Sequence, residues 1–294
     1  MRQATTYNQH QSKSLHAIDV VFIRKHNFNQ RFYRIKLLEK GDYMFKKLNI
    51  FIIWAALGLI LSNPAAADKT VEDFEVWGGV FTQGNFGFIN PNNPDLKKFR
   101  WWMEGQGRFG NDASQFTQSL IRPGVGYALT DKIVVWAGYA WAPTAEPIQR
   151  VGSFNEHRIW QQVTWADNFS FGRLSARSRF EQRFFDQDAP IPGNNDVAHR
   201  FRQLVKLAVP MPSIDPNLSF IIQDELFIAM TTVGNPGFIS NGYDQNRAFV
   251  GLGYKVNQYA TVELGYMNQF INRPHSARPD QMMHNLVASL FLNF

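Results

Sequence analysis

The stretch SARSRFEQRFF, residues 175–185, alternates charged and apolar side chains with a period of two. Arginine or glutamate occupies every second position from Arg177 to Arg183, and Phe180 and Phe184 fall on the opposite register. Successive side chains of a β-strand point to opposite faces. The stretch therefore predicts a strand with one charged face and one apolar face, and a fold that offers each face a suitable environment.

Segments with this period repeat through the chain, separated by clusters of Gly, Pro, Asn and Asp. Such runs, bounded by turn-forming residues, are typical of strands. No segment shows the period of an amphipathic helix, so we predict an all-β fold. The predicted strands are 71–82, 98–109, 117–129, 132–142, 155–165, 172–185, 198–209, 217–230, 243–256, 259–270 and 284–294.

A soluble β-sandwich and a transmembrane β-barrel both produce such alternation. Long connections at 143–154, 186–197, 231–242 and 271–283 alternate with short ones, as extracellular loops and periplasmic turns do in outer-membrane barrels. Strands of about 12 residues, rising about 3.3 Å each and tilted near 40°, cross roughly 30 Å. The pattern therefore favours a transmembrane antiparallel up-and-down β-barrel.

The number of strands is predicted from parity as well as from the pattern. Single-chain bacterial barrels have an even number of strands, whereas the predicted segments number eleven. The region EVWGGVFTQGNFGF could hold two short strands, which would give twelve, or the first segment could lie outside the barrel, which would give ten. We predict 10–12 strands and favour twelve.

Two hairpin sequences repeat one arrangement of glycine and tyrosine. GVGYALTDKIVVWAGY and GLGYKVNQYATVELGY place these residues at identical spacing. By alternation Tyr127, Tyr139, Tyr254 and Tyr266 share the apolar face, and we expect them near the short turns in an aromatic girdle facing lipid.

The end of the chain, HNLVASLFLNF, carries a terminal aromatic residue, Phe294. It resembles the C-terminal strand by which bacterial outer-membrane proteins are recognised for assembly. We therefore expect the barrel-assembly machinery to act on this chain during biogenesis, and outer-membrane lipids to surround the product.

Residues 44–67 have the layout of a secretory signal peptide. Two lysines precede an apolar run from Leu48 to Leu61, and three alanines ending at Ala67 follow. The run is short for a membrane-spanning helix. We expect Sec export, cleavage after Ala67 and location in the outer membrane of a Gram-negative bacterium, with a retained anchor as the alternative. Residues 1–43 are interpreted as a disordered start-site artefact, and 68–294 as a single barrel domain.

The charge balance excludes some partners. Residues 1–67 carry 10 Lys and Arg against 3 Asp and Glu, whereas residues 68–294 carry 20 against 21. The exported part thus has no excess of positive charge for a nucleic acid to bind. The chain contains no cysteine, which excludes disulfides and thiolate metal ligands. We expect no cofactor and no metal.

Alternation assigns 13 basic and 6 acidic residues to the lumen, so the predicted interior is cationic. Glu181, Glu225 and glutamine side chains are expected to hydrogen-bond to the crowded arginines. The predicted lumen-lining residues are Glu75, Arg100, Glu104, Arg108, Arg122, Glu156, Arg158, Arg173, Arg177, Arg179, Glu181, Arg183, Arg200, Arg202, Lys206, Glu225, Arg247, Lys255 and Glu263.

Two roles compete for this lumen, and an enzymatic role is weighed separately for the chain. A network of Arg, Glu and Gln could fill and close it, and we favour this reading. A narrow pore preferring anions is the alternative, because rings of Arg and Lys select anions. A lipid-modifying hydrolase is disfavoured: such outer-membrane enzymes carry His-x-Ser-Asn, and here Phe238 stands where the histidine would precede Ser240 and Asn241. Without an imidazole the serine is a poor nucleophile.

Four stretches indicate a family. They are FEQRF at 180–184, YDQNRAFVGLGYKV at 243–256, ELGYMNQF at 263–270 and RWWMEGQGRFG at 100–110. Behind a signal peptide, they resemble the bacterial outer-membrane barrels grouped as domain of unknown function 2490. The resemblance covers essentially all of residues 68–294. It implies a fold and a location, and it supplies no catalytic or binding residues.

Overall fold

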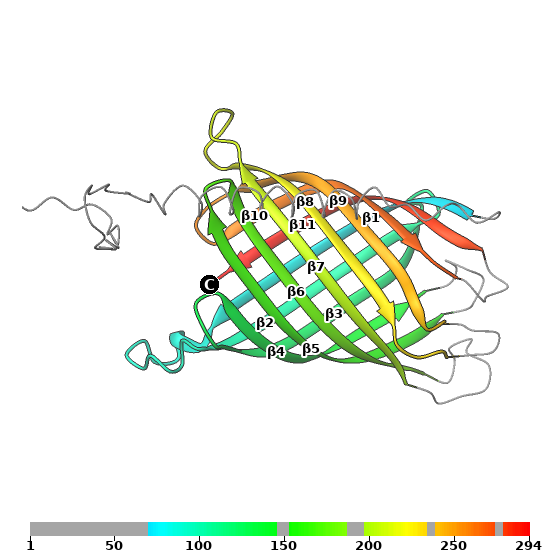
Figure 1. The fold of residues 1–294 in the computed structure, drawn as a ribbon, viewed down its shortest axis with the longest axis horizontal. Helices are drawn as coiled ribbons and strands as arrows, with labels where there is room; N and C mark the ends of the chain where they lie inside the picture. The colour runs from blue at the N-terminus through cyan, green and yellow to red at the C-terminus, as the bar shows by residue number, and fades with distance from the viewer. Residues whose placement is uncertain (1–69, 146–152, 187–196, 234–238, 274–278) are drawn as a thin grey trace, which may run out of the picture. The chain divides into compact units, whose positions relative to one another are not determined.

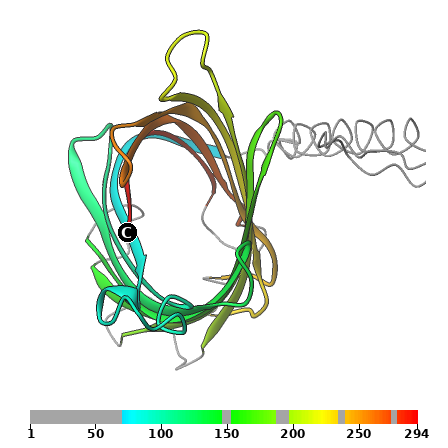
Figure 2. The same cartoon turned by 90° about the vertical axis from the view of Figure 1, so that its left-hand side faces the viewer.

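Eleven strands close into a barrel in the computed structural model, which describes residues 70–145, 153–186, 197–233, 239–273 and 279–294 (Figures 1 and 2). The proposed signal peptide and residues 1–43 lie outside the described residues. The strands are β1 (Thr70–Asn85), β2 (Phe99–Gly110), β3 (Gln115–Ala128), β4 (Ile133–Thr144), β5 (Phe154–Phe169), β6 (Gly172–Phe185), β7 (Ala198–Pro210), β8 (Leu218–Ala229), β9 (Gly242–Lys255), β10 (Ala260–Ile271) and β11 (Asp280–Asn293). One 3-10 turn, η1 (Phe86–Phe88), follows β1.

The predicted all-β barrel is confirmed, and each predicted segment coincides with one strand. The preference for twelve strands is wrong. The region that could have held two short strands is the single long strand β1, followed by η1. β1 pairs with β11 from Thr70 to Gln83 and with β2 from Val76 to Asn85, so it has a neighbour on both sides and leaves no place for another strand.

An odd number of strands changes how the barrel closes. Each strand is antiparallel to its neighbour in sequence, but β1 and β11 run parallel, from Thr70 opposite Asp280 to Gln83 opposite Asn293. The expectation of a purely antiparallel barrel is therefore corrected at this one pair. A closed sheet leaves no unpaired edge amides, and here the parallel pair completes that closure.

The two ends of the barrel differ in their connections. The connections 129–132, 170–171, 211–217 and 256–259 lie at one end, here called the turn end, together with Phe294 at the end of β11 (Figure 1). The longer connections between β4 and β5, β6 and β7, β8 and β9, and β10 and β11 lie at the other, the loop end. This arrangement of short and long connections reverses only near the start of the barrel. There the long connection 86–98 joins β1 to β2 at the turn end, and the short connection 111–114 joins β2 to β3 at the loop end.

Apolar side chains cover much of the outer face of the barrel. Val125 is 61% exposed and Leu264 is 53% exposed, and both belong to long rows of outward Val, Leu and Ile. The inward positions of the same strands are buried, as at Arg122 and Glu263. The period of two in the sequence thus corresponds to an outer apolar face and an inner polar one.

Aromatic side chains gather at the turn end of this outer face. Phe294 stacks between Trp101 and Tyr259, with ring centroids 6.0 and 5.8 Å away, and Phe99 packs edge-on against Tyr127 at 5.2 Å. At the loop end the outward residues near the strand termini include Phe74, Phe109, Phe116, Trp141 and Phe184. The outer face therefore has an aromatic collar at each end.

The four tyrosines of the repeated hairpins all lie on the outer face, but only two lie near the turns. Tyr127 and Tyr254 each lie one residue before the end of their strands, at the turn end. Tyr139 and Tyr266 lie in the middle of β4 and β10. Their placement near the short turns is therefore corrected.

Each mid-strand tyrosine instead meets a histidine eighteen residues further along the chain. Tyr266 Oη lies 2.6 Å from Nδ1 of His284, and Tyr139 contacts Nδ1 of His157. The two hairpins thus share an outer contact as well as their glycine and tyrosine spacing.

Some outward positions are polar, which the simple alternation did not predict. They bond to one another across neighbouring strands: Gln161 to Gln182, Ser178 to Gln203, and Asn246 to Asp224. An internal partner is what such groups need where water is scarce. No helix among the described residues is long and apolar enough to span a membrane.

The repeated glycines have a steric cause on the inner face. A Cβ atom on Gly124 or Gly138 would lie 2.5 or 2.4 Å from the Trp160 ring, and one on Gly251 or Gly265 would lie 2.6 Å from Phe249. Glycine at these positions leaves room for a large aromatic ring against the barrel wall. The same demand explains why both hairpins share the pattern.

Replacing Gly138 by Ala should lower the free energy of unfolding by about 1–3 kcal/mol, because the added methyl also meets the backbone oxygen of Pro123 at 2.3 Å and overpacking carries such a penalty. Gly107 has open space around its Cβ position, so Gly107→Ala should change stability by less than about 0.5 kcal/mol. Urea unfolding followed by heat-dependent gel mobility measures both. Equal stability of the two variants would contradict the packing described here.

Candidate functional site

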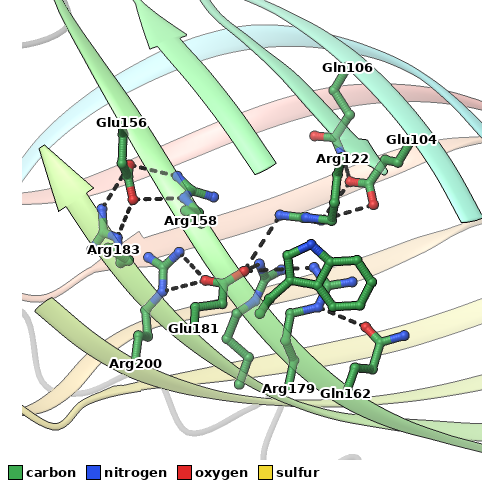
Figure 3. A network of polar contacts seen from close by, with 12 residues as sticks. Glu104, Gln106, Arg122, Glu156, Arg158, Gln162, Arg179, Glu181, Arg183 and Arg200 are labelled. Carbon is green, nitrogen blue, oxygen red and sulfur yellow. Dashed lines mark hydrogen bonds and ion pairs between the residues drawn. The ribbon is translucent and has the colours of Figure 1, made fainter. Parts of the chain in front are cut away.

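Glu181 is the centre of the ionic network inside the barrel (Figure 3). Its side chain is fully buried. Arg200, its register partner on β7, donates from Nη2 to Oε2 at 2.7 Å, and Arg202 donates from Nη1 to Oε1 at 2.9 Å. Arg122 on β3 approaches the same carboxylate to 3.6 Å. Because β3 and β6 are not neighbours in the sheet, this contact crosses the lumen.

Glu225 on β8 extends the network. It accepts hydrogen bonds from Arg177 at 2.7 Å and from Nε and Nη2 of Arg202 at 3.0 and 2.9 Å. Arg202 therefore bridges two carboxylates, Glu181 and Glu225, and it stacks over Phe227 with Cζ 4.4 Å from the ring centroid. Charge-assisted bonds of this kind are stronger than neutral ones, so Arg202 ties three strands together.

Further pairs form on the other walls. Glu104 faces Arg122 across β2 and β3 and accepts two bonds from its Nη1, at 2.8 and 2.9 Å. Glu156 is shared by Arg158 and Arg183, whose Nε atoms donate at 2.7 and 2.5 Å (Figure 3). Each of these carboxylates is almost completely buried, so its charge requires such partners.

Lys206 and Glu263 form a separate pair nearer the turn end. The Nζ atom lies 2.5 and 2.7 Å from the two carboxylate oxygens. The same ammonium lies 4.6 Å from the ring centroid of Phe291. A cation over an aromatic face gains further attraction.

Arg179 is buried without a full set of acceptors. Its Nε atom donates to Gln162 at 2.7 Å, its guanidinium lies over Trp160 at 5.0 Å, and Glu181 stays 3.8 Å away. Both Nη atoms lack a hydrogen-bond partner in the described part of the chain. A buried donor left unpaired costs about 1–3 kcal/mol, and here the aromatic face offsets part of that cost.

Two arginines flank one tryptophan without any carboxylate partner. The guanidinium of Arg108 lies 3.9 Å from the centroid of Trp77, and that of Arg247 lies 4.9 Å from it. Arg108 donates only to neutral oxygens, those of Gln118 and Gln106. Arg247 forms no hydrogen bond or ion pair among the described residues.

Two cavities, of about 220 and 200 Å³, lie in the lumen between residues that the structure describes. The larger reaches the loop end, where it is lined by the strand-terminal residues Thr144, Phe154 and Ile271, and the smaller extends toward Phe81 and Phe291 near the turn end. Five residues border both cavities and form the layer between them, here called the dividing layer: Trp77, Gln106, Arg122, Arg202 and Arg247.

Most of the predicted lumen residues take part in this interior. Glu75, Glu104, Arg122, Glu156, Arg158, Arg179, Glu181, Arg200, Arg202, Glu225 and Glu263 are buried, and Arg108, Arg177, Arg183, Lys206 and Arg247 are half-buried. Three others do not join the network. Arg100, Arg173 and Lys255 lie at the turn end, at or next to strand termini, and Arg173 and Lys255 are exposed. Their assignment to the lumen interior is corrected. The alternation predicts which face a side chain points to, but not where along the barrel axis it lies.

Aromatic rings inside the barrel were missed. Trp77, Trp160 and Phe227 are buried and lie beneath arginines. Their positions share the register of charged neighbours, Trp77 with Glu75, for example, so alternation alone could have placed them inward. They were not predicted, because this face was expected to carry polar side chains only. Asp244, 3.6 Å from Arg200, was also overlooked.

The disfavoured hydrolase alternative concerned Ser240 and a histidine that would activate it. No hydrogen bond joins Ser240 to a histidine among the described residues, and Phe238 lies outside them. His157 and His284 contact tyrosines on the outer face. Within the described ranges no three acidic or histidine side chains gather as a metal site would require.

Comparison with known proteins supports the sequence resemblance. The family described as "Protein of unknown function (DUF2490)" matches residues 74–281. The chain belongs to this family. A protein of Methylorubrum extorquens, described as uncharacterized, is 31% identical over 246 residues, which cover 83% of this chain and 97% of the relative. No solved structure matches the chain. The family's description states neither a fold nor a location.

Replacing Glu181 by Gln should destabilise this family member by about 3–5 kcal/mol, because the buried arginines that share the carboxylate lose their counter-charge. Glu72→Gln is the matched control, since Glu72 is exposed on the outer face and lies 3.9 Å from His284. We expect that variant to change stability by less than about 0.5 kcal/mol. Guanidinium unfolding of the detergent-solubilised barrel measures the difference. A Glu181→Gln barrel as stable as the control would show that the network is dispensable.

Proposed function

We propose that the chain is an outer-membrane β-barrel of a Gram-negative bacterium whose cationic lumen is closed by the Arg, Glu and Gln network. The observation that carries the proposal is the contrast between the two faces of the barrel. The outer face is apolar and ends in aromatic collars, and the inner face is ion-paired. A lipid bilayer is the surrounding in which both faces are stable.

The outer face supports the location. Monomeric soluble proteins rarely expose a contiguous apolar surface of more than a few hundred Å². Here exposed Val, Leu, Ile, Phe and Tyr occur on every strand, among them Val80 on β1, Val163 on β5 and Leu286 on β11. Trp and Tyr prefer the boundary between lipid and water, which matches the collar around Phe294.

The contacts across the lumen support closure. Arg122 from β3 meets Glu181 from β6, and Arg247 from β9 meets Trp77 from β1. Trp77 and Arg122 belong to the dividing layer, so side chains from several walls meet between the two cavities. A passage from one cavity to the other would have to separate these groups.

Cysteine labelling tests the location, because the chain contains no cysteine of its own. A Leu264→Cys variant in lipid nanodiscs should react with a lipid-phase maleimide and resist a water-soluble impermeant one until urea unfolds the barrel. Asn92→Cys is the control, since Asn92 is exposed in the connection after η1; it should react with the water-soluble reagent at once. Equal, rapid reaction of both variants with the water-soluble reagent would place the Leu264 face in water and reject the membrane location.

A narrow pore that prefers anions is the second candidate function. It is favoured by the excess of basic residues around the larger cavity, where Arg108 and Arg247 have no acidic partner. Rings of arginine attract anions and repel cations. The two candidates differ in whether the dividing layer passes ions.

Planar-bilayer recording distinguishes the candidates. For the closed lumen we expect no steady current above the lipid baseline, and a current in the double variant Arg202→Ala with Glu225→Ala, which removes paired groups together and opens the dividing layer. Heat-dependent gel mobility checks that the variant is folded. Steady wild-type current with an anion-selective reversal potential in a salt gradient would reject closure and favour the pore.

A further inference from the structure

We infer that the larger lumenal cavity is a binding site for a small oxyanion, a molecule carrying a phosphate or carboxylate group, held between Arg108 and Arg247. The inference deepens the proposed function and rests on its cationic lumen. It names a class of ligand for one part of that lumen, where two guanidinium groups converge on one tryptophan and neither forms an ion pair among the described residues.

Pairing sets these two arginines apart from five others that line the cavity. Arg158, Arg183, Arg200 and Arg202 each form an ion pair with a carboxylate, and so does Arg122. Arg108 and Arg247 form none among the described residues. Their Nε atoms are buried without a hydrogen-bond partner.

Two of the three acids around the cavity are already paired with arginines. Glu156 is shared by Arg158 and Arg183, and Asp244 lies 3.6 Å from Arg200. Glu75 accepts a hydrogen bond from Nε1 of Trp77 at 2.7 Å and forms no ion pair in the described part of the chain. Glu75 is thus one carboxylate beside two guanidinium groups, so a net positive charge remains around Trp77.

Trp77 holds the two cations in place. With Arg108 at 3.9 Å and Arg247 at 4.9 Å from its centroid, the indole attracts both through its ring face. A guanidinium stacked on a ring keeps its N–H groups at the edge, where they can donate in pairs to a planar carboxylate or to a phosphate. The arrangement is thus prepared for an anion before the anion arrives.

The size and position of the cavity limit the ligand. Its volume of about 220 Å³ is below the range of about 300–1,000 Å³ that is usual for drug-sized ligands. It reaches the loop end of the barrel, and Leu120 and Met283 supply apolar contacts beside the arginines. A small organic phosphate or carboxylate fits this combination, and entry from the loop end does not require the dividing layer to open.

Calorimetric titration of the folded barrel in phosphatidylcholine nanodiscs with inorganic phosphate, and in parallel with succinate, tests the inference. We expect saturable binding of at least one probe at one site per chain, weakened at least about tenfold in Arg108→Gln and in Arg247→Gln because each loses a charged hydrogen-bond donor. Arg247→Lys keeps the charge but loses the paired N–H donors of the guanidinium. We expect its affinity to lie between those of the wild type and Arg247→Gln.

Arg173→Gln is the matched control, because Arg173 is exposed at the turn end and donates only to Asn168, at 3.4 Å. It should bind both probes as the wild type does. Heat-dependent mobility confirms that each variant is folded, and the titration of wild-type protein stands on its own if a variant does not fold. Absence of saturable binding of both probes to the wild type, or unchanged binding in the folded Arg108 and Arg247 variants, would overturn the inference.

A failure of the oxyanion-site inference can be distinguished from a failure of the closed-lumen proposal. Lack of binding together with a silent bilayer would reject the oxyanion site and leave closure intact. Binding together with steady current would support the site and reject closure.

Discussion

Closure of the sheet is the constraint on which the rest of this structure depends. Each strand finds a partner on both sides only because β1 and β11 meet, and a sheet with an open edge could not be stable in a bilayer. Closure also defines a narrow interior, which every second side chain must enter. Closure therefore crowds the arginines of β6 and β7 together and makes carboxylates between them necessary. Neither strand alone would have this effect.

The interior accommodates its excess of cations in three ways. Carboxylates are shared, as Glu181 is between Arg200 and Arg202. Neutral acceptors replace carboxylates, as Gln162 does for Arg179. Aromatic faces stabilise what remains, as Phe227 and Trp77 do for Arg247. An interior made only to hold the barrel together could use well-packed apolar residues at lower cost, so the surplus of unpaired guanidinium at Arg108 and Arg247 is the feature that points beyond stability, toward an anionic ligand.

The family match covers most of the barrel. The matched region, residues 74–281, runs from β1 into β11 and so contains the central ionic network and both arginines beside Trp77. The relative from Methylorubrum extorquens aligns over nearly its whole length. Whether a member carries a basic residue at both positions beside an inward tryptophan is a simple test of how far the proposed oxyanion site extends through the family.

The sequence by itself determined the class of fold, the position of each strand and the direction of most side chains, because a period of two is a local property that each segment carries alone. It even indicated that Glu181 and Glu225 would bond to the arginines. The tertiary structure decided the strand number and the parallel pairing of β1 with β11, since closure depends on register between residues more than 200 positions apart. It also decided which residues are deep and which lie at the rim: Arg173 and Arg177 have the same direction on β6, but only Arg177 reaches Glu225. The depth of a residue along the barrel axis and its contacts across the lumen depend on the tilt and register of many strands. Neither can therefore be deduced from one segment of the sequence.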